Sequence, residues 1–167
     1  ESKIRVIAPD VGGGFGGKLQ QTPEEMIAFA VARKLGKPVK FTETRSESLL
    51  TAHHGRDQWQ RLTLAATKEG KVTGLKVDLL ADLGAYVAIV GGGVPVLGAF
   101  MFNAIYKFPA YQFQTTNVLT NKTWTDAYRG AGRPEATFAI ERLMDELANE
   151  LGKDPLEVRE MNWIKHE

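Results

Sequence analysis

The stretch Val11-Gly12-Gly13-Gly14-Phe15-Gly16-Gly17-Lys18 decides how the rest of the chain is interpreted, because it places five glycines around a single phenylalanine. Glycine adopts positive φ without steric cost, and its backbone can approach a ligand closely because no Cβ intervenes. Ordering such a flexible segment costs conformational entropy. We therefore expect the loop to hold a ligand, and consecutive backbone N–H groups suit an anion.

Length and composition are those of an ordinary globular domain. The 167 residues are 43% hydrophobic and 25% charged, and the net charge is +1. This length and hydrophobic fraction suffice for one domain with a buried core. The near-neutral charge argues against nucleic acid or a membrane surface as partner, and no apolar run reaches the length of a membrane span. No signal peptide is recognised, so we expect a cytoplasmic protein. A start at Glu1 rather than Met leads us to expect a piece, or one subunit, of something larger.

Metal-ligating side chains are few. The sequence has no cysteine, so it cannot carry a disulfide or a cysteine-ligated iron–sulfur cluster. The adjacent His53 and His54 have no carboxylate at ligand spacing, and His166 stands apart from both. We therefore expect no metal-binding residue.

Helices are predicted from their start and stop signals. Thr22-Pro23-Glu24-Glu25 combines an N-cap, a first-turn proline and the acid of a capping box, and Gly36 follows the apolar face. Asp154-Pro155-Leu156-Glu157 begins the last helix in the same way. Pro134 fits the first turn of a helix that Gly152 ends. Further helical segments are expected at residues 44–50 and, buried, at 96–105.

Strands are predicted from alternating apolar residues. The clearest pattern is a long hairpin within residues 57–87, with a turn at Lys68-Glu69-Gly70-Lys71. Other strands are expected at residues 3–11, 39–44 and 111–119. Short strands mixed with several capped helices favour an α+β fold over a strict βαβ array.

Two nucleotide-binding patterns nearly fit the glycine loop. Gly12, Gly14 and Gly17 satisfy G-x-G-x-x-G, and Glu43 ends the next expected strand, where a ribose-binding acid would stand. However, the helix cap at Thr22 comes several residues late, and the βαβ alternation of a doubly wound sheet is missing.

The P-loop pattern fits less well. It matches through the lysine of the loop, but Leu19 replaces the Ser or Thr that binds magnesium. A nucleotide-binding oxidoreductase domain that uses the G-x-G-x-x-G loop, and a non-catalytic scaffold subunit, stay open as alternatives.

Three motifs in register resemble those of one family. They are the glycine loop, Thr44-Arg45-Ser46-Glu47, and Ala127-Tyr128-Arg129-Gly130-Ala131-Gly132-Arg133-Pro134-Glu135-Ala136. Over nearly its whole length the chain is similar to the molybdenum-binding subunit of the xanthine dehydrogenase, aldehyde oxidase and carbon monoxide dehydrogenase family. The resemblance implies a single molybdenum-cofactor-binding domain over residues 1–167, as a fragment or split part of a larger catalytic subunit.

The resemblance also implies the cofactor and the residues beside it. The cofactor is molybdenum held by molybdopterin, in prokaryotes often as the cytosine dinucleotide. The cofactor-binding residues are then Gly13, Gly14, Phe15, Gly16, Arg129, Gly130 and Ala131, and the substrate-pocket residues are Leu19, Tyr128 and Gly132. Backbone N–H groups without a neighbouring Cβ can bind an oxo group or a phosphate. The guanidinium of Arg129 is permanently charged and offers several N–H donors in one plane. The structural alternatives are a core anchor for Phe15 and a salt bridge from Arg129 to Asp126 or Glu135.

Departures from the family pattern bear on the substrate. Carbon monoxide dehydrogenases carry a copper-binding cysteine in the second loop, which this chain lacks. Purine oxidisers carry a glutamate where this chain has Leu19, and an arginine near Val96-Leu97. An apolar pocket suits an aldehyde or an aromatic heterocycle better than a purine.

The same resemblance implies how the chain takes part in the reaction. The family oxidises its substrates with water-derived oxygen and passes electrons through iron–sulfur clusters to FAD, which we expect on partner subunits. Its general base is a glutamate far downstream, without a counterpart here, so no catalytic residue is assigned. We expect the chain to contribute one wall of the molybdopterin site and to be inactive without the remainder of the molybdenum-binding subunit.

Overall fold

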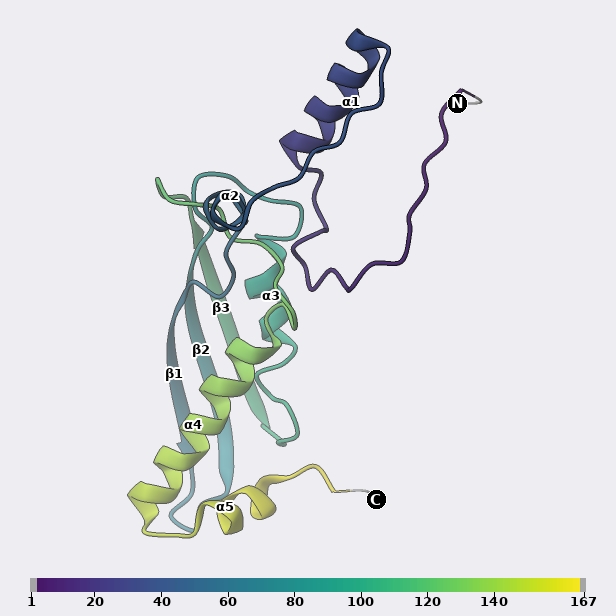
Figure 1. Ribbon diagram of the computed structural model, residues 1–167. Coiled ribbons are helices and arrows are strands. Elements are labelled where there is room, and N and C mark those ends of the chain that lie inside the picture. The colour runs from purple at the N-terminus through teal and green to yellow at the C-terminus, as the bar shows by residue number, and fades with distance from the viewer. Residues whose placement is uncertain (1–2, 166–167) are drawn as a thin grey trace. The chain divides into compact units, whose positions relative to one another are not determined.

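The computed structural model describes residues 3–165, and their contacts divide the chain into two units (Figure 1). The first unit extends to Ala52 and contains α1 (Pro23–Leu35) and α2 (Arg45–Thr51). The second unit begins at His53 and contains the remaining elements. These are β1 (Gln58–Ala66), β2 (Val72–Asp82), α3 (Gly93–Ala99), β3 (Ala110–Val118), α4 (Arg133–Leu151) and α5 (Pro155–Asn162).

The sheet of the second unit has the order β1-β2-β3. β1 and β2 form an antiparallel hairpin in which Leu62 lies opposite Val77, and β2 pairs with β3 in parallel. The predicted hairpin and the strand predicted at 111–119 are therefore confirmed. The parallel pair needs a crossover, which the segment containing α3 supplies between β2 and β3. Helices combined with this mixed sheet confirm the α+β fold.

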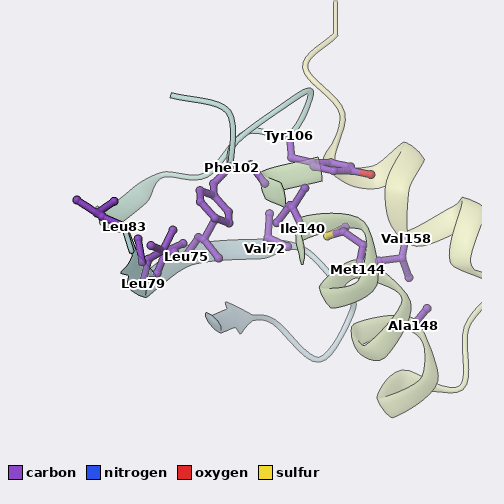
Figure 2. Close-up of a cluster of buried hydrophobic side chains, with 13 residues drawn as sticks. Val72, Leu75, Leu79, Leu83, Phe102, Tyr106, Ile140, Met144, Ala148 and Val158 are labelled. Atoms are coloured by element: carbon purple, nitrogen blue, oxygen red, sulfur yellow. The ribbon is translucent and has the colours of Figure 1, made fainter. Parts of the chain in front are cut away.

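One face of β2 forms the core together with α4. Alternate residues of β2 are buried, including Leu75, Val77 and Leu79, because successive side chains of a strand point to opposite faces of the sheet. Figure 2 shows Leu75 and Leu79 gathered with Ile140 and Met144 of α4, both of which are fully buried. The core thus fixes α4, and with it the loop that leads into α4.

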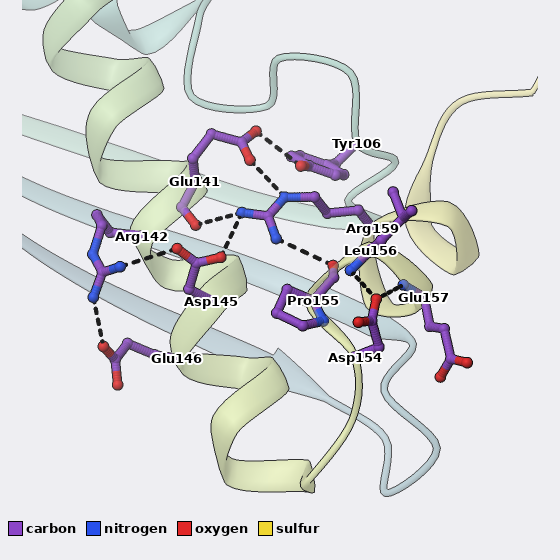
Figure 3. Close-up of polar contacts among 10 residues, drawn as sticks. All are labelled: Tyr106, Glu141, Arg142, Asp145, Glu146, Asp154, Pro155, Leu156, Glu157 and Arg159. Atoms are coloured by element: carbon purple, nitrogen blue, oxygen red, sulfur yellow. Dashed lines mark hydrogen bonds and ion pairs between the residues drawn. The ribbon is translucent and has the colours of Figure 1, made fainter.

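A network of ion pairs joins α5 to α4 (Figure 3). Arg159 Nε donates to Glu141 Oε2 at 2.8 Å, and Arg159 Nη2 donates to Asp145 Oδ1 at 2.7 Å. The hydrogen bond from Arg159 holds the pKa of the Asp145 carboxyl below its ordinary value. The buried Tyr106 donates to Glu141 Oε1 at 2.8 Å, so the network also anchors the segment before β3.

The predicted helix ends are found where the local signals placed them. Glu25 accepts a hydrogen bond from the Thr22 N–H at 3.2 Å, and Asp154 Oδ1 accepts from the Leu156 N–H at 2.7 Å. Gly36 and Gly152 end α1 and α4 with φ of 62° and 63°, the left-handed conformation that glycine tolerates best.

Three predicted segments differ from the structure. Residues 3–11 and 39–44 are exposed and lie in no strand, so the strands predicted there are wrong. The helix predicted at 96–105 is α3, which begins earlier and ends at Ala99, and Val96 and Leu97 remain 44% and 45% exposed. Over the described residues, no helix combines the length and the apolar character needed to cross a membrane.

Candidate cofactor-binding loops

The glycine loop of the first unit has several left-handed residues. Gly13, Phe15 and Gly16 have φ of 108°, 52° and 101°. The backbone turns back twice, because Gly17 N–H donates to Gly14 C=O at 2.9 Å and Leu19 N–H donates to Gly16 C=O at 3.1 Å. The sequence prediction that glycine is needed for positive φ in this loop is met at Gly13 and Gly16, and Phe15 shares the conformation.

Side chains also shape this loop. The Phe15 ring covers Gly13 so closely that a Cβ there would lie 2.8 Å from two ring carbons. Phe15 is 55% exposed, so within the described chain it is not a core anchor. Lys18 Nζ donates to the Gly13 carbonyl at 2.6 Å, which ties the two ends of the loop together. α1 begins only at Pro23, whereas a dinucleotide-binding helix would begin within the glycines.

The second loop, residues 128–132, has three consecutive residues with positive φ. Gly130, Ala131 and Gly132 have φ of 101°, 38° and 92° in succession. A Cβ on Gly132 would lie 2.6 Å from the Val94 carbonyl oxygen and 3.0 Å from the Gly98 nitrogen. Glycine is therefore required at 132 by both its φ and the close approach of α3. We predicted Gly132 at a substrate pocket, and in this unit its contact is the backbone of α3.

Arg56 is the main side chain that holds this loop, and sequence reasoning missed it. Its Nη2 donates to the Arg129 carbonyl at 2.5 Å. Its guanidinium lies 4.6 Å from the centroid of the Tyr128 ring, a cation–π distance. Its Nη1 lies 3.6 Å from Glu135 Oε1. No local motif marks this arginine, because its loop partners lie more than 70 residues further along the chain.

Glu135 is a buried carboxylate in the first turn of α4. Its side chain is only 7% exposed, and neither carboxylate oxygen has a hydrogen-bond partner among the described residues. The 3.6 Å separation from Arg56 is an ion pair but too long for a hydrogen bond. Glu135 is therefore paired with Arg56 through charge alone.

A backbone bridge fastens the segment that carries Arg56 to the chain before the loop. His54 N–H donates to Trp124 C=O at 3.2 Å, and Asp126 N–H donates to His54 C=O at 2.9 Å. His53 Nε2 lies 3.1 Å from the Ala127 carbonyl. His53 therefore has a structural contact in this bridge. In the described part of the chain, no group of three or more His, Cys, Asp or Glu residues could hold a metal ion.

An open groove of about 570 Å³ lies between β1 and α4. Arg56 and Glu135 form part of its wall, and its apolar lining includes Leu62 and Phe138. The predicted cofactor residues Arg129, Gly130 and Ala131 are not among the residues that line it. The groove is therefore next to the loop but distinct from the predicted cofactor contacts.

The predicted residues fall into both units. In the second unit, Tyr128, Arg129 and Gly130 lie around Arg56, and Gly132 lies against the backbone of α3. Gly13–Gly16 and Leu19 belong to the first unit. That the two loops face one cofactor stays a prediction. The chemistry of each loop fits an anionic, oxygen-rich group, since both combine a backbone poor in Cβ atoms with a cationic side chain, Lys18 in one and Arg129 in the other. Apart from its two chain neighbours, no atom of the described residues lies within 4 Å of where a Cβ on Gly12 would be, which leaves room for such a group.

Comparison with known proteins finds a matching family model and similar proteins that cover nearly the whole chain. The family model described as molybdopterin cofactor-binding domain matches residues 1–163. The nicotine 6-hydroxylase large subunit of Paenarthrobacter nicotinovorans is 36% identical over 168 residues, which cover 99% of this chain and 21% of that protein. The carbon monoxide dehydrogenase large chain of Hydrogenophaga pseudoflava is 39% identical over 170 residues, which cover 100% of this chain and 21% of that protein.

Solved structures agree with these relatives. The crystal structure of quinoline 2-oxidoreductase from Pseudomonas putida 86 has a TM-score of 0.81 and 35% identity, and the match covers 94% of this chain and 20% of that one. The chain spans about a fifth of the length of the nicotine 6-hydroxylase and carbon monoxide dehydrogenase relatives.

Proposed function

This chain belongs to the molybdopterin cofactor-binding domain family, and on that premise we propose that it forms one wall of the molybdopterin site of a molybdenum hydroxylase. The observation that carries the proposal is the positive φ of several residues in each motif loop, namely Gly13, Phe15 and Gly16 in the first and Gly130, Ala131 and Gly132 in the second. Such a backbone exposes N–H groups to an anion without interference from Cβ atoms.

Each loop has a separate part in this proposal. The N–H groups of Gly14, Phe15 and Gly16 would hold oxygen atoms of the cofactor. Lys18 closes the loop through the Gly13 carbonyl. Arg129 supplies a fixed positive charge for the anionic group. Gly130 and Ala131 allow the backbone of the second loop to pass close to the cofactor. A bound molybdopterin-held molybdenum supplies the two-electron redox chemistry and the Lewis acidity.

For the substrate we propose an aromatic nitrogen heterocycle, with an aldehyde as the alternative. Leu19 is half exposed and apolar, where a purine oxidiser has a glutamate. Relatives named for nicotine and quinoline match at 36% and 35% identity, which supports a heterocycle. Carbon monoxide is disfavoured in spite of the 39% identity to a carbon monoxide dehydrogenase, because the chain has no cysteine to bind copper.

We further propose that the working enzyme needs more than this chain. No residue here is assigned as the general base, so the remainder of the molybdenum-binding subunit supplies it. Relatives are named as large subunits or as a complex subunit, which supports partners that carry the iron–sulfur clusters and FAD. The cofactor form we favour is the cytosine dinucleotide.

Elemental analysis of the full-length protein, purified with its partners from the native host, tests the proposal. We expect molybdenum in stoichiometric amount. Arg129→Met should retain roughly tenfold less molybdenum, because it loses a charge-assisted hydrogen bond to the anion. Arg61→Met, which removes an exposed arginine of β1, should retain the wild-type amount. Stoichiometric NAD without molybdenum in the wild-type protein would overturn the proposal in favour of a nucleotide-binding oxidoreductase.

A further inference from the structure

Arg56 joins two consecutive residues of the second loop. Its Nη2 donates to the Arg129 carbonyl, and its guanidinium covers the Tyr128 ring. Gly55 supports the same contact, because a Cβ at this position would lie 2.9 Å from Tyr128 Cβ. One side chain and its neighbour therefore fix the backbone directly before Gly130, where the left-handed run begins.

The backbone of Arg56 is itself strained. Its φ of 65° lies in the left-handed region, which is costly for a residue with a Cβ and a long side chain. Such a conformation persists only where the surrounding contacts determine it. Here the bridge between His54 and residues 124–126 fixes the chain immediately before Arg56. The strain therefore serves to aim this guanidinium at the loop.

Glu135 supplies the opposing charge. A buried carboxylate without hydrogen-bond partners is costly, and such a group in a native structure calls for an explanation. Its oxygen lies 3.6 Å from Arg56 Nη1, on the guanidinium that also bonds the loop. The first turn of α4 lowers the cost further, because the helix N-terminus carries partial positive charge. A carboxylate in this place holds the guanidinium in one orientation.

We infer that the Arg56–Glu135 pair is the positioning device of the 128–132 loop and sets how Arg129, Gly130 and Ala131 meet the cofactor. This inference rests on the proposed function. Arg56 acts through the Arg129 carbonyl and the Tyr128 ring, and Glu135 acts through Arg56. With its charge balanced by Glu135, Arg56 serves as a fixed donor to the backbone of the loop.

The test uses the full-length protein with its partner subunits and three measurements. These are molybdenum per protomer, the Mo(V) electron paramagnetic resonance spectrum after dithionite reduction, and the midpoint of thermal unfolding. The main variant is Arg56→Met combined with Glu135→Met, because Arg56→Met alone would leave a buried charge without compensation. The matched control is Arg142→Met, an arginine of the same groove whose ion pairs with Asp145 and Glu146 are exposed.

We expect the double variant to retain about a tenth or less of the wild-type molybdenum, the scale on which residues that orient a ligand affect metal binding. The control should keep its molybdenum and its spectrum. Arg56→Lys keeps a positive charge beside Glu135 but not the planar fork, so it should unfold at the wild-type temperature and still show a changed Mo(V) spectrum.

Two outcomes separate the inference from the proposed function. Unchanged molybdenum and an unchanged spectrum in Arg56→Lys overturn the inference, even if the double variant fails to fold. Absence of molybdenum from the wild-type protein overturns the proposed function, and the inference with it.

Discussion

At the residue scale, Gly132 is the position where the second loop tolerates least change. It combines a φ of 92° with a backbone contact, since a Cβ would lie 2.6 Å from the Val94 carbonyl oxygen. Backbone atoms of α3 cannot move aside as a flexible side chain would. We predict that Gly132→Ala destabilises the protein by about 2–5 kcal/mol, from backbone strain and overpacking together. Denaturant unfolding of the full-length protein measures this change.

Gly93 provides the matched control for that substitution. It lies at the start of α3, and its φ is not positive. Apart from its chain neighbours and the adjacent helix backbone, no atom in the described part of the chain lies within 4 Å of the position of an added Cβ. Alanine is the better helix former there, so Gly93→Ala should be neutral or slightly stabilising. Equal effects of the two substitutions would contradict the role given to Gly132.

Sequence reasoning found the two loops at the residue scale but not what holds them. Runs of glycine are visible in a sequence because few other residues adopt positive φ, which is why Gly13, Gly16 and Gly130 could be predicted to be special. Arg56 could not be found in this way. It has positive φ without being glycine, and its partners Arg129 and Glu135 are distant in sequence. Only the fold brings these three residues together.

At the element scale, the sequence predicted helix ends well and isolated strands poorly. A helix cap is made by residues a few positions apart, as at Thr22 and Asp154, so its signal is local. A strand needs a hydrogen-bonded partner, and alternation alone does not supply one. In the β1–β2 hairpin each strand is the hydrogen-bonded partner of the other, and this hairpin was predicted. Residues 3–11 and 39–44 have apolar residues but lie in no strand.

The junction of α4 and α5 gives a prediction for alkaline pH. Burial, together with the hydrogen bond to Glu141, raises the pKa of Tyr106 to about 12 from an ordinary value of 10.0. Because the folded-state pKa is raised, this residue contributes stability that is present below pH 10.0 and is lost as pH rises toward about 12. In the full-length protein, hydrogen exchange of the α5 amides, measured relative to the intrinsic base-catalysed rate, should therefore accelerate over this interval in the wild type.

Two variants separate Tyr106 from the other perturbed tyrosine. Burial also raises the pKa of Tyr111 to about 12, but Tyr111 donates to the Ala99 carbonyl, away from α5. Tyr106→Phe should weaken the alkaline acceleration at α5, and Tyr111→Phe should leave it unchanged. Tyrosinate absorbance should show that each variant lacks one group that titrates near 12. If Tyr106→Phe instead removes a group that titrates near 10, the buried, Glu141-bonded environment given to Tyr106 is wrong.

At the scale of the whole molecule, the described core belongs to one unit. Each residue of the buried cluster lies in the second unit, from Val72 on β2 to Val158 on α5. Among residues 3–52 none is buried, and the apolar side chains of α1, such as Met26, Ile27 and Phe29, are each about 60% exposed. A helix of this length is marginal alone in water, because most helical stability comes from packing an apolar face.

We therefore predict that the two units differ in autonomy when expressed as separate fragments. The fragment 53–167 should unfold cooperatively on heating, because each fully buried Val, Leu or Ile of its core contributes roughly 1.5–3 kcal/mol. The fragment 1–52 should show little helix by far-ultraviolet circular dichroism and no cooperative transition. A cooperative transition in fragment 1–52 would show that it carries a core of its own. If neither fragment unfolds cooperatively, the sheet and α4 depend on the rest of the subunit for their stability, and the second unit is not autonomous.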